Sequence, residues 1–157
     1  MKQASLSKTK RRIKVYFDLE SDENGYPPAQ NEFLWCIPTD QGTYIVDNVP
    51  FFVRDISLGD EISAGKIGKT LQFSRLLHQS KNSTIRVLLK KEGLAEMIRE
   101  KLDNLGCGTE LMDELSLLSV TMPPDARVTE TLSFLDSEAE QGNIGIEESA
   151  VRYQNLH

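Results

Sequence analysis

Cysteine and histidine are scarce in this sequence of 157 residues. It contains two cysteines and two histidines, and one of the histidines is the terminal His157. A Cys/His zinc site therefore has too few ligands, and we expect no bound metal and no cofactor. Cys36 and Cys107 are far apart in sequence, and two thiols in a chain of this kind are more often reduced than paired. We therefore expect no disulfide.

Long apolar runs are also missing. No stretch approaches the roughly 18 apolar residues of a membrane span, and the beginning of the sequence has no apolar core like that of a signal peptide. We therefore expect a cytoplasmic protein that does not bind membranes. With 39% hydrophobic and 27% charged residues, the composition is that of an ordinary globular protein whose length suits one compact domain.

Basic residues are concentrated at one end of the sequence. The first 14 residues carry a charge of +6 and contain no acid, whereas the whole chain carries −6. From Asp103 onward, eleven acidic residues stand against Arg127 and Arg152, a net charge of −9. An acidic body repels nucleic acid and attracts basic proteins. Because segment 1–12 also lacks aromatic residues for base stacking, we interpret it as a disordered leader and expect no nucleic-acid partner.

Alternation of apolar and polar residues predicts strands through most of the first 90 residues. Between Arg12 and Glu20, for example, apolar residues occupy every second position, which is the pattern of a half-buried strand. Gly, Asp and Asn separate the runs at short intervals. The pattern predicts a curled antiparallel sheet or small barrel. We expect its strands at 12–20, 32–37, 43–48, 51–56, 61–67, 71–78 and 84–89.

The apolar residues change to helical spacing after residue 90. The spacing predicts helices over 92–105, ended by Gly106, and over 125–141, capped by Asp125. Strands are expected at 115–122 and 144–153. The sequence therefore predicts an α+β fold whose second half is a β-α-β-α-β, ferredoxin-like unit. We expect a single domain at 13–157 with two lobes, 13–89 and 90–157.

No group of residues has the spacing of a catalytic or phosphate-binding motif. Segment Gly65–Thr70 ends like a phosphate-binding loop, but Ser63 stands where that loop requires glycine and no helix follows, so we interpret it as a hairpin turn. His78 has serines nearby but no pattern of a hydrolase around it. The adjacent carboxylates Glu147 and Glu148 point to opposite faces of a strand. We therefore expect no catalytic residues.

Three short motifs resemble a known family. They are Asp47-Asn48-Val49-Pro50-Phe51-Phe52, Ile56-Ser57-Leu58-Gly59-Asp60 and Ser83-Thr84-Ile85-Arg86-Val87. In this order they resemble an uncharacterised bacterial family, catalogued as domain of unknown function 4265, and the resemblance extends from about Val15 to Tyr153. The resemblance assigns no chemical role to these positions. We interpret the following motif residues as structural: Asp47, Asn48, Pro50, Phe51, Gly59, Asp60, Ser83, Thr84 and Arg86.

Each motif also has a physical interpretation of its own. Asp47 and Asn48 can accept hydrogen bonds in a turn, and Gly59 suits a turn that needs a positive φ. Arg86 stands alone among apolar residues of a strand. If its guanidinium is buried, it needs a carboxylate partner such as Asp47 or Asp60.

Two classes of function remain. We favour a non-catalytic binding protein, an immunity (antitoxin-type) protein that neutralises a cognate bacterial toxin through an acidic surface, an inference from charge, size and family type. The alternative is an enzyme or small-ligand-binding domain with a site between the lobes. On the expected helix 125–141, Asp136 and other acids lie outside the apolar stripe and can face a partner. The candidate partner-binding residues are Glu130, Phe134, Glu138, Glu140, Glu147, Glu148 and Tyr153.

Overall fold

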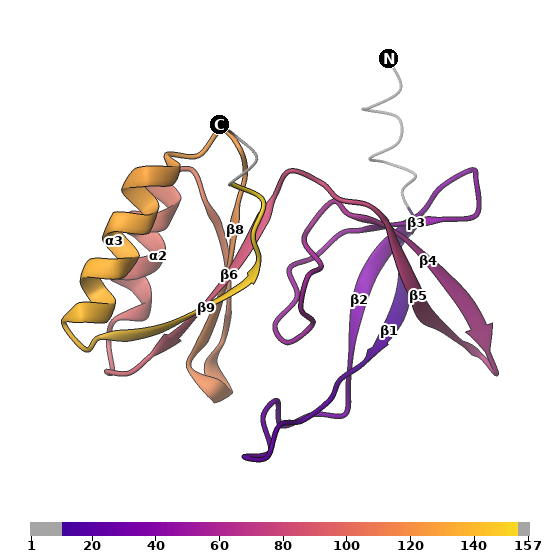
Figure 1. Cartoon of the computed structure of the whole chain (residues 1–157), viewed down its shortest axis with the longest axis horizontal. Helices are drawn as coiled ribbons and strands as arrows, with labels where there is room; N and C mark the ends of the chain where they lie inside the picture. Colours follow the sequence, from indigo (N-terminus) through magenta and orange to yellow (C-terminus); the bar gives the residue numbers. More distant parts are fainter. Residues whose placement is uncertain (1–10, 154–157) are drawn as a thin grey trace. The chain divides into compact units, whose positions relative to one another are not determined.

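The computed structural model describes residues 11–153 and divides the chain into two compact units (Figure 1). Among the described residues, unit 1 comprises 11–48 and 59–79, and unit 2 comprises 49–58 and 80–153. Segment 49–58 thus lies between the two parts of unit 1 in the sequence but belongs to unit 2. The leader expected at 1–12 lies almost entirely outside the described residues.

Unit 1 is a closed barrel of five strands, which confirms the barrel expected from the alternating pattern. Neighbouring strands pair antiparallel, but β1 and β5 close the barrel in parallel, with Val15 opposite Leu71. Buried apolar side chains such as Phe17 and Leu34 fill its interior. The strands are β1 (Ile13–Asp18), β2 (Asn31–Pro38), β3 (Tyr44–Val46), β4 (Glu61–Ile67) and β5 (Thr70–His78).

The segment that resembles a phosphate-binding loop is a hairpin turn, as predicted. Ile67 at the end of β4 pairs with Thr70 at the start of β5. Gly68 between them has a φ of 63°, a conformation that glycine adopts without steric cost. The lysines of this turn are therefore held at the tip of a two-stranded ribbon.

Unit 2 is a four-stranded antiparallel sheet in the order β7-β8-β6-β9, with both helices on one face (Figure 1). Ile98 and Leu102 of α2 and Leu135 of α3 are buried against the apolar side chains of β6 and β8. The elements follow the order β6 (Ser83–Leu89), α2 (Ala95–Asn104), β7 (Gly108–Met112), the 3-10 turn η1 (Asp113–Leu115), β8 (Leu117–Met122), α3 (Val128–Glu140) and β9 (Ile144–Ala150). No helix in the described part of the chain is long and apolar enough to span a membrane.

The structure of unit 2 differs in several details from the second half that the sequence predicts. The sequence places strand 84–89 in the first lobe, but β6 pairs with β8 and β9, so the units divide before Ser80 rather than after residue 89. Two strands separate the helices instead of one, because β7 precedes β8. The helix cap is also different. Helix α3 begins after Arg127, and no side chain caps it, so Asp125 does not have the expected role.

The predicted strand at 51–56 is wrong, because segment 49–58 forms no strand. Side chains of the sheet bind its carbonyl groups instead. The Pro50 carbonyl accepts hydrogen bonds from Arg86 Nη1 at 3.0 Å and Ser119 Oγ at 2.7 Å. The Val53 carbonyl accepts from Arg86 Nη2 at 2.8 Å and Ser149 Oγ at 3.2 Å. These bonds satisfy buried carbonyls that a strand would have satisfied with a neighbouring backbone.

Candidate functional site

The third family motif places Arg86 at the centre of unit 2. Its side chain is only 2% exposed, and its Nε donates to Oε1 of Glu147 at 3.1 Å. Glu147 lies opposite Arg86 in the β6–β9 register, and its second oxygen accepts from Arg54 at 2.6 Å. Arg86 thus has the carboxylate partner that its burial requires, and this partner is Glu147, whereas Asp47 pairs with Arg12 in unit 1. The carboxylate of Glu147, a candidate for partner binding, is instead occupied within the unit.

Two further motif residues hold the C-terminal part of segment 49–58, one of them indirectly through Arg152. The hydroxyl of Thr84 forms a buried hydrogen bond with the hydroxyl of Ser57, and Ser83 Oγ accepts from the backbone N–H of Arg152 at 2.8 Å. The guanidinium of Arg152, which is 4% exposed, donates to the carbonyls of Ser80, Asn82 and Asp55. The sequence gives no sign of this role, because the three acceptors are distant in sequence and belong to the backbone.

The first two motifs also have structural roles in unit 1. Asn48 Oδ1 accepts from the backbone N–H of Trp35 at 2.9 Å, and Asp47 forms an ion pair with Arg12 at 3.1 Å. Gly59 has a φ of 88°, which confirms the positive φ expected there. Its N–H donates to the Val46 carbonyl at 2.8 Å. These motif residues therefore hold turns and strands of unit 1 together, and their interpretation as structural stays a prediction.

A cavity of about 450 Å³ lies beside α3 and β9, and we call it the acidic pocket. It brings together two candidates from the sequence, Glu148 and Tyr153, with Asp136 of α3. The Tyr153 hydroxyl donates a hydrogen bond to Glu148 Oε2. Burial, followed by this hydrogen bond and the charges of Glu148 and Asp136, raises the pKa of Tyr153 to about 12. The residues that line the pocket are Ile85, Leu132, Leu135, Asp136, Ile146, Glu148 and Tyr153.

The lining of the acidic pocket suits a positively charged group on an aliphatic stem. Ile146 is 37% exposed and provides an apolar wall on β9, while Asp136 and Glu148 supply two carboxylates. No basic residue lines the pocket in the described part of the chain. Lys and Arg side chains bury their methylene groups against apolar surface and keep their charged ends beside polar groups. A Lys or Arg side chain therefore matches both parts of this lining.

The other candidates for partner binding lie outside the pocket. Glu130 forms an exposed ion pair with Arg127 at 3.9 Å, and Glu138 accepts a hydrogen bond from Asn143 Nδ2 at 2.8 Å. Phe134 packs against the hydrophobic core of the unit, with Lys101 Nζ 5.9 Å from its ring centroid. Glu140 is exposed at the last turn of α3. Of the candidate partner-binding residues, only Glu148 and Tyr153 thus line the acidic pocket.

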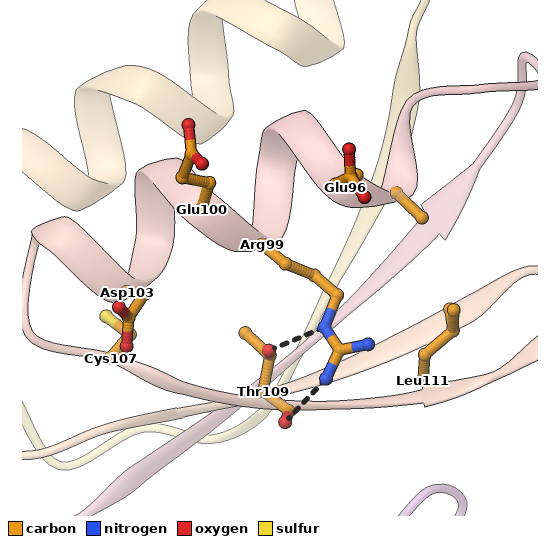
Figure 2. A pocket seen from close by; sticks show the side chains of 8 residues that line it. Glu96, Arg99, Glu100, Asp103, Cys107, Thr109 and Leu111 are labelled. Carbon is orange, nitrogen blue, oxygen red and sulfur yellow. Dashed lines mark hydrogen bonds between the residues drawn. The ribbon is translucent and has the colours of Figure 1, made fainter.

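A second cavity, of about 620 Å³, lies between α2 and β7 (Figure 2). Arg99 extends from α2 toward β7, where its Nε donates to Thr109 Oγ1 at 3.0 Å. Three carboxylates of α2 also line this cavity, and Cys107 lies at one end. Burial raises the pKa of the Cys107 thiol, so this thiol is not activated as a nucleophile. The carboxylates belong to Glu96, Glu100 and Asp103.

The negative charge of the protein belongs to unit 2. Counted over the whole sequence, unit 1 contains nine acidic and nine basic residues, whereas unit 2 contains 15 acidic and nine basic residues. The described residues contain no group of three or more His, Cys, Asp or Glu side chains that could hold a metal ion. The acidic pocket thus lies in the unit that would attract a basic partner from solution.

The fold and its motifs define an α+β protein in which a five-stranded barrel is followed by a four-stranded sheet with two helices. The chain belongs to the family described as domain of unknown function (DUF4265), whose sequence profile matches residues 32–146. Its fold is similar to that of a hypothetical protein from Neisseria gonorrhoeae, known from a crystal structure, with a TM-score of 0.76 and 18% sequence identity. The similarity covers 89% of this chain and 95% of that one. No curated protein matches the sequence.

Proposed function

We propose that this chain is a non-catalytic protein-binding module whose acidic pocket receives a Lys or Arg side chain of a basic protein. The observation that carries the proposal is the position of Asp136 and Glu148 in one cavity with partly apolar walls, which no basic residue lines among the residues that the structure describes. A volume of about 450 Å³ is within the range of pockets that hold small organic groups. A long basic side chain from a partner is such a group.

The partner that we propose is a bacterial toxin, and this chain would be the immunity (antitoxin-type) protein that neutralises it. Toxins that act on nucleic acid need basic clefts to hold their substrate. An acidic protein can block such a cleft, and complementary charge accelerates the association of the two proteins. The excess of six acidic over basic residues in unit 2 supports this choice.

We also propose that unit 2 has a ferredoxin-like fold. Its elements follow the order β-α-β-β-α-β, and both helices lie on one face of the sheet. The strand order β7-β8-β6-β9 places the first and third strands of the unit at the centre. This order supports the proposal.

The proposal requires that a gene beside this one encode a basic, toxin-like protein, and a metabolic gene neighbourhood would count against it. Association with that protein is then measured by stopped-flow. Charge reversal in the variant Asp136→Lys/Glu148→Lys removes both pocket carboxylates. We expect association at low salt to slow by about tenfold or more, with a smaller defect at physiological salt, where the Debye length is about 8 Å. The control Asp113→Lys/Glu114→Lys makes the same change in net charge at the exposed turn η1.

The two variants distinguish binding in the acidic pocket from a general effect of the negative charge of unit 2. A defect in the pocket variant that clearly exceeds the defect in the control supports the acidic pocket as the binding site. Equal defects would show that only the overall charge of unit 2 matters. If neither variant changes the association rate, the partner binds elsewhere and the proposed site is wrong.

A further inference from the structure

The outer face of the barrel in unit 1 carries a row of aromatic rings. In the register of β1 and β2, Tyr16 lies opposite Phe33 and Lys14 lies opposite Trp35. Neighbouring positions on both strands are buried in the barrel, so these four side chains share the outer face. The ring centroids of Tyr16 and Phe33 are 5.9 Å apart, and those of Phe33 and Trp35 are 5.7 Å apart. Phe33 is 38% exposed.

Positive charge accompanies the rings. The Nζ atom of Lys14 lies 4.5 Å from the ring centroid of Phe33 and 5.4 Å from that of Trp35. The guanidinium of Arg12 lies 5.3 Å from the Trp35 ring, but it also pairs with Asp47. Lys14 is therefore the cation of this row that has no carboxylate partner among the described residues.

The β4–β5 hairpin adds two more lysines to the same face. A cavity of about 390 Å³ lies between the hairpin and β1 and β2, and Lys14, Trp35, Lys66 and Lys69 are among the residues that line it. No acidic residue lines it in the described part of the chain, and neither hairpin lysine forms an ion pair with residues 11–153. The segment that resembles a phosphate-binding loop thus supplies cations beside the half-buried rings of Tyr16 and Trp35.

We propose that this surface binds single-stranded nucleic acid, with bases stacked on the aromatic row and phosphates held by the three lysines. We call it the stacking patch and define it by Lys14, Tyr16, Phe33, Trp35, Lys66 and Lys69. Exposed rings beside a basic groove are the combination that binds unpaired strands without sequence preference. A duplex keeps its bases stacked and cannot use the rings.

The proposed stacking patch is an alternative to the expectation that nucleic acid is not a partner, and that expectation stays untested. That expectation depends on the absence of aromatic residues from the basic segment 1–12 and on the acidic body. The fold supplies the rings from β1 and β2 instead, and it does so in unit 1, where acidic and basic residues are equal in number. The proposal is independent of the acidic pocket, which lies in unit 2.

Trp35 makes the experiment direct, because it is the only tryptophan of the chain. The full chain is titrated with oligothymidine and with oligouridine of about 12 nucleotides, and tryptophan emission is recorded. We expect saturable quenching by one or both, and their relative affinities distinguish DNA from RNA. With three phosphate contacts, the slope of log K against log salt is expected to be about −2.

Three variants separate charge from stacking. The variant Lys14→Gln/Lys66→Gln/Lys69→Gln is expected to bind at least tenfold more weakly and with a shallower salt slope. Phe33→Ser is expected to bind several-fold more weakly with an unchanged slope. The control Lys81→Gln/Lys90→Gln/Lys91→Gln removes the same charge from unit 2 and is expected to bind like the original chain.

Several results would overturn the proposal. The first is an absence of quenching at low salt. The second is equal loss of binding in the lysine variant and its control, which would indicate a general charge effect. The third is an affinity for a duplex of the same length that equals the affinity for single strands. Because Ile67 at the hairpin tip is 65% exposed, vesicles with anionic lipid are a further probe, and quenching by vesicles alone would show a membrane surface instead.

Discussion

Arg86 on β6 and Glu147 on β9 lie opposite each other in the sheet of unit 2, and the 3.1 Å ion pair between them aligns the guanidinium that holds segment 49–58. The two remaining nitrogens of Arg86 donate to the carbonyls of Pro50 and Val53. One buried side chain therefore connects two strands and an irregular segment. Because a guanidinium presents its donors in a fixed plane, lysine could not replace it here.

We predict that Arg86→Met lowers the free energy of unfolding of unit 2 by about 2–4 kcal/mol, because it removes three hydrogen bonds from a charged donor. The acceptors keep their second donors, which are Arg54 for Glu147, Ser119 for the Pro50 carbonyl and Ser149 for the Val53 carbonyl. The measurement is urea unfolding followed by circular dichroism at 222 nm, where the two helices of unit 2 dominate. Lys90→Met is the control, since Lys90 is exposed in the same unit. Equal stability of the two variants would contradict the role assigned to Arg86.

Two threonines that face each other in the β6–β8 register are expected to respond in opposite ways to replacement by valine. The buried hydroxyl of Thr121 has no hydrogen-bond partner, whereas the hydroxyl of Thr84 bonds to Ser57. Thr121→Val should leave stability unchanged or raise it by about 1 kcal/mol, and Thr84→Val should lower it by about 1–3 kcal/mol. The measurement is the urea concentration at the midpoint of unfolding of each variant. Destabilisation by Thr121→Val as large as that by Thr84→Val would show that the Thr121 hydroxyl has a partner.

Both cysteines should resist alkylation in the folded protein. Burial, with a smaller contribution from Asp47, raises the pKa of Cys36 to about 12, and both thiols are buried and free. At pH 8 the reactive thiolate is therefore scarce. Mass spectrometry after treatment with iodoacetamide, without reductant, should show no labels on the native chain and two on the unfolded chain. Fewer than two labels on the unfolded chain would reveal a disulfide.

The titration of Tyr153 reports on the acidic pocket. Its pKa is raised to about 12 in the folded chain, above the usual value near 10, so folding favours the protonated phenol. The stabilisation is complete below about pH 10 and is lost as the pH rises through about 12. Ultraviolet absorbance should show a late phase that Tyr153→Phe removes and that Glu148→Gln moves to lower pH. A phase near pH 12 that persists in Tyr153→Phe belongs to another tyrosine.

Much of the barrel could be predicted from the sequence because strand alternation is local information. The strand expected at 61–67 matches β4, and that at 71–78 differs from β5 by one residue. Strand β7 could not be predicted in this way, since it has five residues, begins at a glycine and contains no fully buried side chain. Segment 51–56 is apolar like a strand, but distant side chains, not a neighbouring strand, satisfy its carbonyls.

The sequence shows that the C-terminal part is acidic, but it does not show which acidic side chains lie together. The net charge of the C-terminal part predicts a basic partner, and that prediction stays untested; among its candidate residues, Glu148 and Tyr153 line the acidic pocket. The register of β9 decides that Glu148 lies beside the pocket while Glu147 pairs with Arg86 on the other face. A shift of one residue would exchange their roles, and no local pattern fixes that register.

The central claim, that the acidic pocket accepts a basic side chain, is tested most directly by NMR titration of the isotope-labelled chain with a short peptide that contains one arginine. We expect saturable shifts concentrated at Asp136, Ile146, Glu148 and Tyr153, and we expect these shifts to be absent with a glutamate peptide and lost in Asp136→Asn/Glu148→Gln. Shifts spread equally over the carboxylates of α2, or shifts that survive in the double variant, would contradict it.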